Sequence, residues 1–155
     1  MITYKLFRIR NGKLYPLYVE ASREMPLGEW LHAGVGELVD ATHVKASGCG
    51  GKLSLRPGFH STMVPFTDWI GKKTEFGLVQ RKDTVWCECE VDGEERWIQG
   101  GSRELVDGWY RFKTNSKQKD PWIISSRLKI NRILERKDVE VLCFMHGITA
   151  QRMEA

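Results

Sequence analysis

The stretch Thr84-Val85-Trp86-Cys87-Glu88-Cys89-Glu90-Val91 is the most regular part of this 155-residue chain. One set of alternating positions is apolar or carries a thiol, and the other set carries a tryptophan and two glutamates. The first set is Val85, Cys87, Cys89 and Val91, and the second is Trp86, Glu88 and Glu90. A period of two predicts a β-strand with one buried face. The dipeptide Asp92-Gly93 then favours a tight turn, so the fold is expected to form around an antiparallel sheet.

Other segments on both sides of this strand also predict antiparallel pairing. Ile2–Arg10 is rich in β-forming residues, Asn11-Gly12 is typical of a two-residue turn, and Lys13–Val19 supplies a partner strand. These three predict an N-terminal β-hairpin. Further along, Gly108–Thr114 alternates between two sets of side chains, and Trp122–Ser125 is a short apolar run.

Two segments favour helix. In Met25–Leu31, three apolar side chains fall at positions i, i+3 and i+4, which predicts a short helix with one apolar face. Lys137–His146 predicts a C-terminal helix, with Gly147 placed to end it. A strand over Val139–Phe144 remains the alternative for the last element.

Together these elements predict an α+β fold, in one domain over residues 1–155, with mostly antiparallel sheet, one short helix and a C-terminal helix. Residues 34–51 hold five glycines and predict a long loop. No apolar run is long enough for a membrane-spanning helix, and no charged region followed by an apolar one opens the chain, so we expect a cytoplasmic protein. A net charge of +4 permits anionic partners.

A cluster of polar side chains surrounds the break at Pro57-Gly58. Arg56 is a candidate ligand for phosphate or carboxylate, and His60 is a candidate acid or base. The adjacent hydroxyls of Ser61 and Thr62 are candidate ligands for ribose or phosphate. The alternative is that these polar groups satisfy nearby backbone groups in a turn.

The order of these motifs resembles that of ADP-ribosyltransferases. The resemblance rests on Leu6-Phe7-Arg8 in a first strand and on Gly58–Thr62. It implies that Arg8 grips a nicotinamide dinucleotide, that Ser61 and Thr62 shape the pocket, and that Glu140 is the family's glutamate on a late strand. Arg8, His60 and Glu140 would then be the catalytic residues. His60 inside the serine segment departs from the family pattern, and a helix at Glu140 would remove that match.

A second resemblance covers more of the chain. Arg56–His60, Thr84–Trp86, Tyr110–Asn115 and Leu128–Leu134 are similar to segments of small uncharacterised proteins of bacteriophages and prophages. This resemblance implies an accessory role in the bacterial host, such as acting against host defence, and implies no particular reaction.

The segment Trp109–Arg132 is both basic and aromatic. It carries seven cations and one carboxylate, a net charge of +6 that exceeds the charge of the whole chain. Cations neutralise phosphates and aromatic rings stack on bases, so this composition favours a nucleic-acid surface. The alternative is a solvated hairpin with its aromatic side chains in the core. The predicted binding residues are Arg111, Lys113, Lys117, Lys119, Trp122, Arg127, Lys129 and Arg132.

The cysteines and glutamates offer weaker candidates. Cys87 and Cys89 could join Cys49, His43 or His60 in a tetrahedral zinc site, but two thiols on a strand are more often buried core residues. We predict no metal and no cofactor. Glu88 and Glu90 are either paired catalytic carboxylates or part of a solvated face.

The sequence therefore favours a phage accessory protein that binds nucleic acid or a host nucleoprotein complex. The alternative is a nucleotide-handling enzyme that resembles ADP-ribosyltransferases, with a dinucleotide pocket formed by Arg8, Arg56, His60, Ser61 and Thr62.

Overall fold

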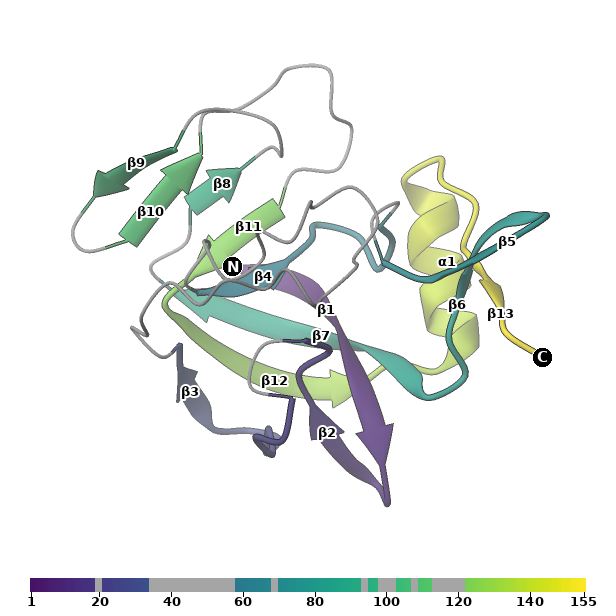
Figure 1. The fold of residues 1–155 in the computed structure, drawn as a ribbon, viewed down its shortest axis with the longest axis horizontal. Coiled ribbons are helices and arrows are strands. Elements are labelled where there is room, and N and C mark those ends of the chain that lie inside the picture. Colours follow the sequence, from purple (N-terminus) through teal and green to yellow (C-terminus); the bar gives the residue numbers. More distant parts are fainter. Residues whose placement is uncertain are drawn as a thin grey trace.

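A computed structural model describes residues 1–18, 21–33, 58–67, 70–92, 95–97, 103–106, 109–112 and 122–155. Its largest element is a five-stranded antiparallel sheet (Figure 1). In spatial order its strands are β2 (Lys13–Tyr15), β1 (Ile2–Arg10), β7 (Thr84–Asp92), β12 (Arg127–Ile133) and β3 (Trp30–His32). The prediction of a mostly antiparallel sheet is confirmed.

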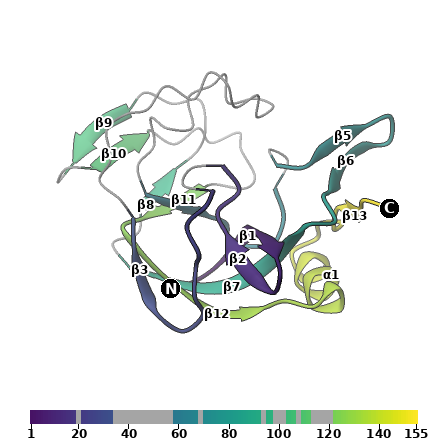
Figure 2. The same ribbon diagram turned by 60° about the horizontal axis from the view of Figure 1, so that its bottom comes forward.

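Three smaller sheets and one helix complete the described part of the chain. The first is β4 (Phe59–Ser61), β11 (Trp122–Ser125) and β8 (Glu95–Trp97), and the second is β9 (Arg103–Val106) with β10 (Trp109–Phe112). The third is β5 (Lys72–Thr74), β6 (Gly77–Gln80) and β13 (Arg152–Met153), in which β13 runs parallel to β6. The helix is α1 (Arg136–Met145). Figure 2 shows α1 beside β6 and β13, at the end of the molecule opposite β9 and β10.

Strand β7 occupies the centre of the large sheet, as its regular pattern predicts. It pairs with β1 from Ile2↔Glu90 to Arg8↔Thr84 and with β12 on its other side. The thiols of Cys87 and Cys89 are fully buried on one face. Two long strands flank β7, so neither edge of this central strand is left with unpaired backbone groups.

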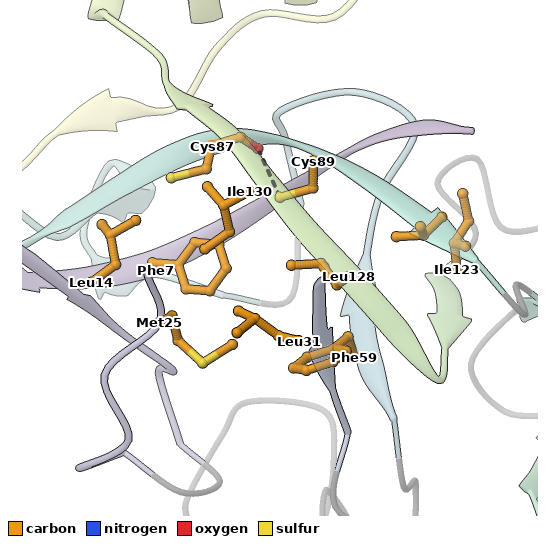
Figure 3. Close-up of a cluster of buried hydrophobic side chains, with 11 residues drawn as sticks. Phe7, Leu14, Met25, Leu31, Phe59, Cys87, Cys89, Ile123, Leu128 and Ile130 are labelled. Atoms are coloured by element: carbon orange, nitrogen blue, oxygen red, sulfur yellow. Dashed lines mark hydrogen bonds between the residues drawn. The ribbon is translucent and has the colours of Figure 1, made fainter. Parts of the chain in front are cut away.

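The main core lies on the face of the sheet that carries these thiols (Figure 3). Strands β4 and β11 help to close it, because Phe59 and Ile123 belong to the same buried cluster. A bridge joins the two layers: the Tyr4 and Thr62 backbone N–H groups each donate to the other residue's carbonyl at 2.8 Å. The buried cluster is Phe7, Leu14, Met25, Leu31, Phe59, Cys87, Cys89, Val91, Ile123, Leu128 and Ile130.

Helix α1 covers one end of the opposite face. Val139 and Cys143 of the helix pack with Trp86 of β7 and Leu6 of β1, which explains why Trp86 is buried on the face that the pattern left polar. At the start of α1, the side chain of Glu135 and that of Asp138 each accept a backbone N–H of the other residue, a capping box. The predicted C-terminal helix is confirmed, and the strand alternative is wrong.

The predicted short helix at Met25–Leu31 is wrong. Gly28 adopts a left-handed conformation with φ +77°, and its N–H donates to the Ile130 carbonyl at 2.9 Å. The chain then enters β3, where Leu31 is buried between two exposed neighbours. Pairing with β12 gives this segment an alternating pattern, and the helical spacing of its apolar residues is coincidental.

Residues 34–51, predicted to be a long glycine-rich loop, lie outside the described residues. Among the described residues, no helix has both the length and the apolar composition needed to cross a bilayer.

Candidate functional site

On the sheet face that α1 partly covers, the part that the helix leaves uncovered carries a row of opposite charges, here called the charged ladder. Strand pairing sets each cation of β12 directly opposite a carboxylate of β7. Lys129 Nζ lies 3.3 Å from Glu90 Oε2, and Arg132 Nη2 lies 3.4 Å from Glu88 Oε1. Side chains that face each other across two strands interact in this way. The ladder consists of the pairs Arg127–Asp92, Lys129–Glu90 and Arg132–Glu88.

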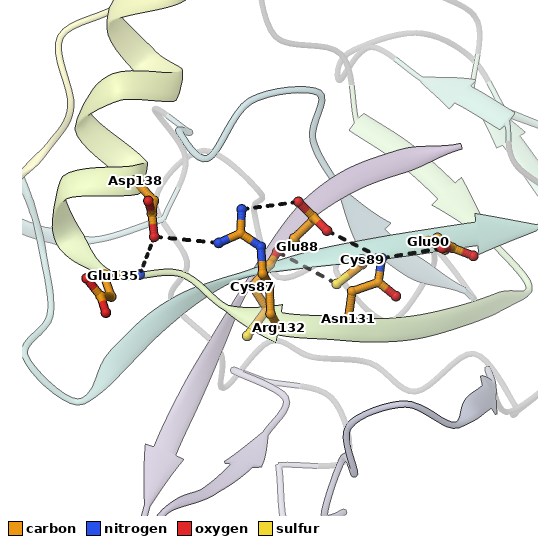
Figure 4. A network of polar contacts seen from close by, with 8 residues as sticks. All are labelled: Cys87, Glu88, Cys89, Glu90, Asn131, Arg132, Glu135 and Asp138. Carbon is orange, nitrogen blue, oxygen red and sulfur yellow. Dashed lines mark hydrogen bonds and ion pairs between the residues drawn. The ribbon is translucent and has the colours of Figure 1, made fainter.

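A β-bulge at Asn131 sets the register of the ladder (Figure 4). The extra residue places Arg132 opposite Glu88, and the Asn131 amide lies 3.4 Å from Glu88 and 3.5 Å from Glu90. Arg132 also contacts Asp138 of α1 at 3.6 Å. Beside the ladder, burial and then the charge of Glu88 raise the pKa of Tyr4. The ladder is thus a fixed network that runs from the helix along β12.

An aromatic ring from a distant segment lies at the far end of the ladder. The Trp30 ring centroid is 5.0 Å from the Arg127 guanidinium carbon and 5.2 Å from Lys129 Nζ, both cation–π contacts. Trp30 belongs to the edge strand β3 and is 39% exposed, which is high for a tryptophan. Sequence reasoning placed Trp30 on a helix, and only the pairing of β3 with β12 brings it here.

The ladder balances its charges. Arg127, Lys129 and Arg132 were predicted to bind nucleic acid, and each is opposed by a carboxylate. Net charge across the three pairs is therefore zero, and little positive potential remains for phosphate. The net positive charge of the segment Trp109–Arg132 comes instead from the cations that precede β11 in the chain.

Those remaining cations are only partly within the described structure. Arg111 lies in β10 and Trp122 in β11, and each is placed by its strand alone. Lys113, Lys117 and Lys119 lie outside the described residues, as do Arg56 and the zinc candidates His43 and Cys49.

The hydroxyls that were predicted to line a pocket form hydrogen bonds to the backbone. Ser61 and Thr62 are buried, and their hydroxyls donate to backbone carbonyls: Ser61 to Ile123 at 3.4 Å, and Thr62 to Val64 at 2.5 Å. This arrangement matches the structural role considered for them, in which a hydroxyl satisfies a nearby backbone group.

The three residues that the resemblance implies are catalytic lie on three different elements. Arg8 Nη1 on β1 is 3.5 Å from the Asp83 carboxylate. His60 lies on β4, where its carbonyl accepts the amine of Lys5 at 2.9 Å. Glu140 is on an exposed face of α1 and pairs with Arg136 at 3.1 Å, so the late strand required by the resemblance is a helix. No described contact joins any two of Arg8, His60 and Glu140.

The buried thiols are poorly suited to bind metal. Burial raises the pKa of Cys89 to about 12 and raises that of Cys87 further, although Lys5 opposes the shift at Cys89. A metal ligand must be a thiolate. Among the described residues, no three histidine, cysteine or acidic side chains are grouped so that they could hold a metal ion.

The Lys5 side chain points from β1 into this same core. Burial lowers the pKa of its amine to about 8 from the ordinary 10.5, although nearby Cys89 opposes the shift. Its hydrogen bond to the His60 carbonyl helps to hold β4 beside β1.

Comparison of the chain with protein-family models, with curated proteins and with solved structures finds no match.

Proposed function

We propose that this protein is a binding module that contacts single-stranded nucleic acid, free or within a host nucleoprotein complex. The observation that carries the proposal is Trp30, an exposed indole at the edge of the sheet whose ring is contacted by Arg127 and Lys129. Bases stack on such rings without sequence preference, and flanking cations favour the phosphates on either side. The phage accessory role, in the cytoplasm of a bacterial host, remains a prediction from the resemblance.

The two parts of the segment Trp109–Arg132 contribute differently to binding. Because the ladder cations already face carboxylates, they hold Trp30 in place and contribute little net attraction. Attraction to phosphate is assigned to Arg111, Lys113, Lys117 and Lys119. The proposal therefore separates base stacking at Trp30 from charge neutralisation elsewhere.

The enzyme alternative has less support. It requires the hydroxyls of Ser61 and Thr62 to face a ligand, and both donate to backbone carbonyls. It also requires a glutamate beside Arg8, whereas Arg8 contacts Asp83 and Glu140 contacts Arg136. Binding of nicotinamide dinucleotide that is lost on Arg8→Ala would revive it.

The test is a fluorescence-anisotropy titration with a labelled single-stranded oligonucleotide. Loss of one stacked base costs about 1–3 kcal/mol, so Trp30→Ala should weaken binding about 5- to 150-fold. Phe76→Ala is the matched control, because Phe76 is also exposed and also lies under an arginine, with Arg152 at 5.7 Å from the ring. Equal affinities for Trp30→Ala and Phe76→Ala would refute the proposal.

A further inference from the structure

Strand β3 exposes a second ring beside Trp30. His32 follows Trp30 by two positions, and these two exposed side chains flank the buried Leu31. Because successive side chains of a strand alternate between faces, Trp30 and His32 lie on the same face of the sheet. Leu31 belongs to the main core and pairs with Leu128 of β12, which fixes the strand beneath the two rings. The edge of the sheet therefore presents two rings in a row.

Each ring lies opposite a cation of β12. Strand pairing sets Trp30 opposite Lys129 and His32 opposite Arg127. Both cations are also paired with carboxylates of β7, so their positions are fixed from the other side. With the described residues, the His32 side chain forms no hydrogen bond and no ion pair. The described contacts thus give the imidazole no structural role.

The spacing of the two rings fits bases that are separated from each other. Two positions along a strand are about 7 Å apart, whereas successive bases in one strand of a duplex rise by about 3.4 Å. Two bases that stack on Trp30 and His32 must therefore be unstacked from each other, which a single strand allows and a duplex does not. Single-strand recognition commonly uses unstacked bases that lie on tryptophan, histidine and other ring side chains.

We propose that β3 holds two consecutive nucleotides of a single strand, with one base stacked on Trp30 and the next on His32. This inference rests on the proposed function and adds a second position to the same site. The ligand must then offer two adjacent bases, so the smallest ligand that fills the site is a dinucleotide. Stacking accepts any base, so the site selects adjacent unpaired bases and not a sequence.

Fluorescence anisotropy with a labelled oligothymidylate tests the second position. His32→Ala should weaken binding about fivefold or more, the lower end of the loss of one stacked base. His32→Phe keeps a ring and should bind about as well as the wild type. His32→Gln keeps hydrogen-bonding groups without a ring and should bind as weakly as His32→Ala. His146→Ala is the matched control, because His146 is also exposed but lies at the end of α1, and it should leave the affinity unchanged.

A second probe tests whether the two bases are consecutive. In an oligothymidylate with an abasic site at every second position, a base on Trp30 has no neighbouring base to offer His32. The wild type should bind this probe about fivefold or more weakly than the intact probe. His32→Ala has lost the second position, so it should distinguish the two probes much less.

The outcomes separate this inference from the proposed function. If Trp30→Ala weakens binding and His32→Ala does not, the two-base site is overturned and stacking on Trp30 alone stands. Equal discrimination between the two probes by the wild type and His32→Ala would overturn the two-base site as well. A wild type that binds neither probe would overturn the proposed function itself.

Discussion

Replacing Lys5 with methionine tests how a buried amine affects stability in this fold. Lys5 enters the core from β1, and burial lowers the pKa of its amine to about 8 from 10.5. This difference of about 2.5 pH units corresponds to at most about 3 kcal/mol of destabilisation when the amine is charged in both states. Methionine is similar in length and carries no charge.

The net gain is smaller than this figure. Lys5 also donates to the His60 carbonyl at 2.9 Å, and leaving a buried acceptor without a donor costs about 1–3 kcal/mol. We therefore expect Lys5→Met to raise the free energy of unfolding by about 0–2 kcal/mol at pH 7.

The pH dependence of the stability difference between Lys5→Met and the wild type is a sharper test than its size at pH 7. Between pH 8 and 10.5 the unfolded state binds the Lys5 proton and the folded state does not, so this group makes the wild type more stable as pH rises. The advantage of Lys5→Met should therefore fall by up to about 3 kcal/mol across that window, below which it is constant. The raised pKa values of Cys87 and Cys89 act in the opposite direction, but they are present in both proteins and largely cancel in the difference.

Urea unfolding of both proteins at half-unit steps from pH 7 to 10.5 measures this difference. A stability difference that does not change across the range would refute the assignment of a buried, depressed amine at Lys5.

Two further predictions use single substitutions with matched controls. Glu88→Gln removes the carboxylate that faces Arg132 in the charged ladder, so it should strengthen oligonucleotide binding at low salt. It should lower the free energy of unfolding by less than about 1 kcal/mol. Asp83→Asn, which removes a carboxylate outside the ladder, should strengthen binding less. Equal gains for the two variants would show that only net charge matters. Gly71→Ala should destabilise the protein by more than about 1 kcal/mol in thermal unfolding, because its Cβ would lie 2.8 Å from a backbone oxygen at φ +154°. Gly77→Ala, at φ +99° with open space, should cost less, and the reverse order would contradict the local geometry.

The sequence predicted elements whose local pattern agrees with their final surroundings. The alternation of Thr84–Val91 defined β7 because one of its faces meets the core along its whole length. Asn11-Gly12 takes up positive φ at both positions, as a two-residue hairpin turn requires, and β1 pairs with β2 across it. The helix at the C-terminus followed from its capping and periodicity.

The wrong prediction and the contacts that the sequence did not predict all depend on pairing between segments far apart in the chain. Met25–Leu31 has helical spacing, but hydrogen bonding to β12 and the left-handed Gly28 decide its structure. The charged ladder depends in part on a bulge at Asn131 that no local pattern marks, because without the extra residue Arg132 would lie on the opposite face from Arg127 and Lys129. For the same reason, the contact between Trp30 and Arg127 could not be predicted from either segment alone.

The central claim is that a single strand of nucleic acid stacks on Trp30 while the cations before β11 neutralise its phosphates. The most direct measurement is the affinity for matched single- and double-stranded oligonucleotides as a function of salt. We predict tighter binding of the single strand, because stacking needs an unpaired base, and a slope of log K against log salt of about −3, from about four neutralised phosphates at −0.7 each. In Trp30→Ala the slope should persist while the preference for the single strand disappears. No binding at low salt, or a preference for the duplex that Trp30→Ala leaves unchanged, would contradict the account.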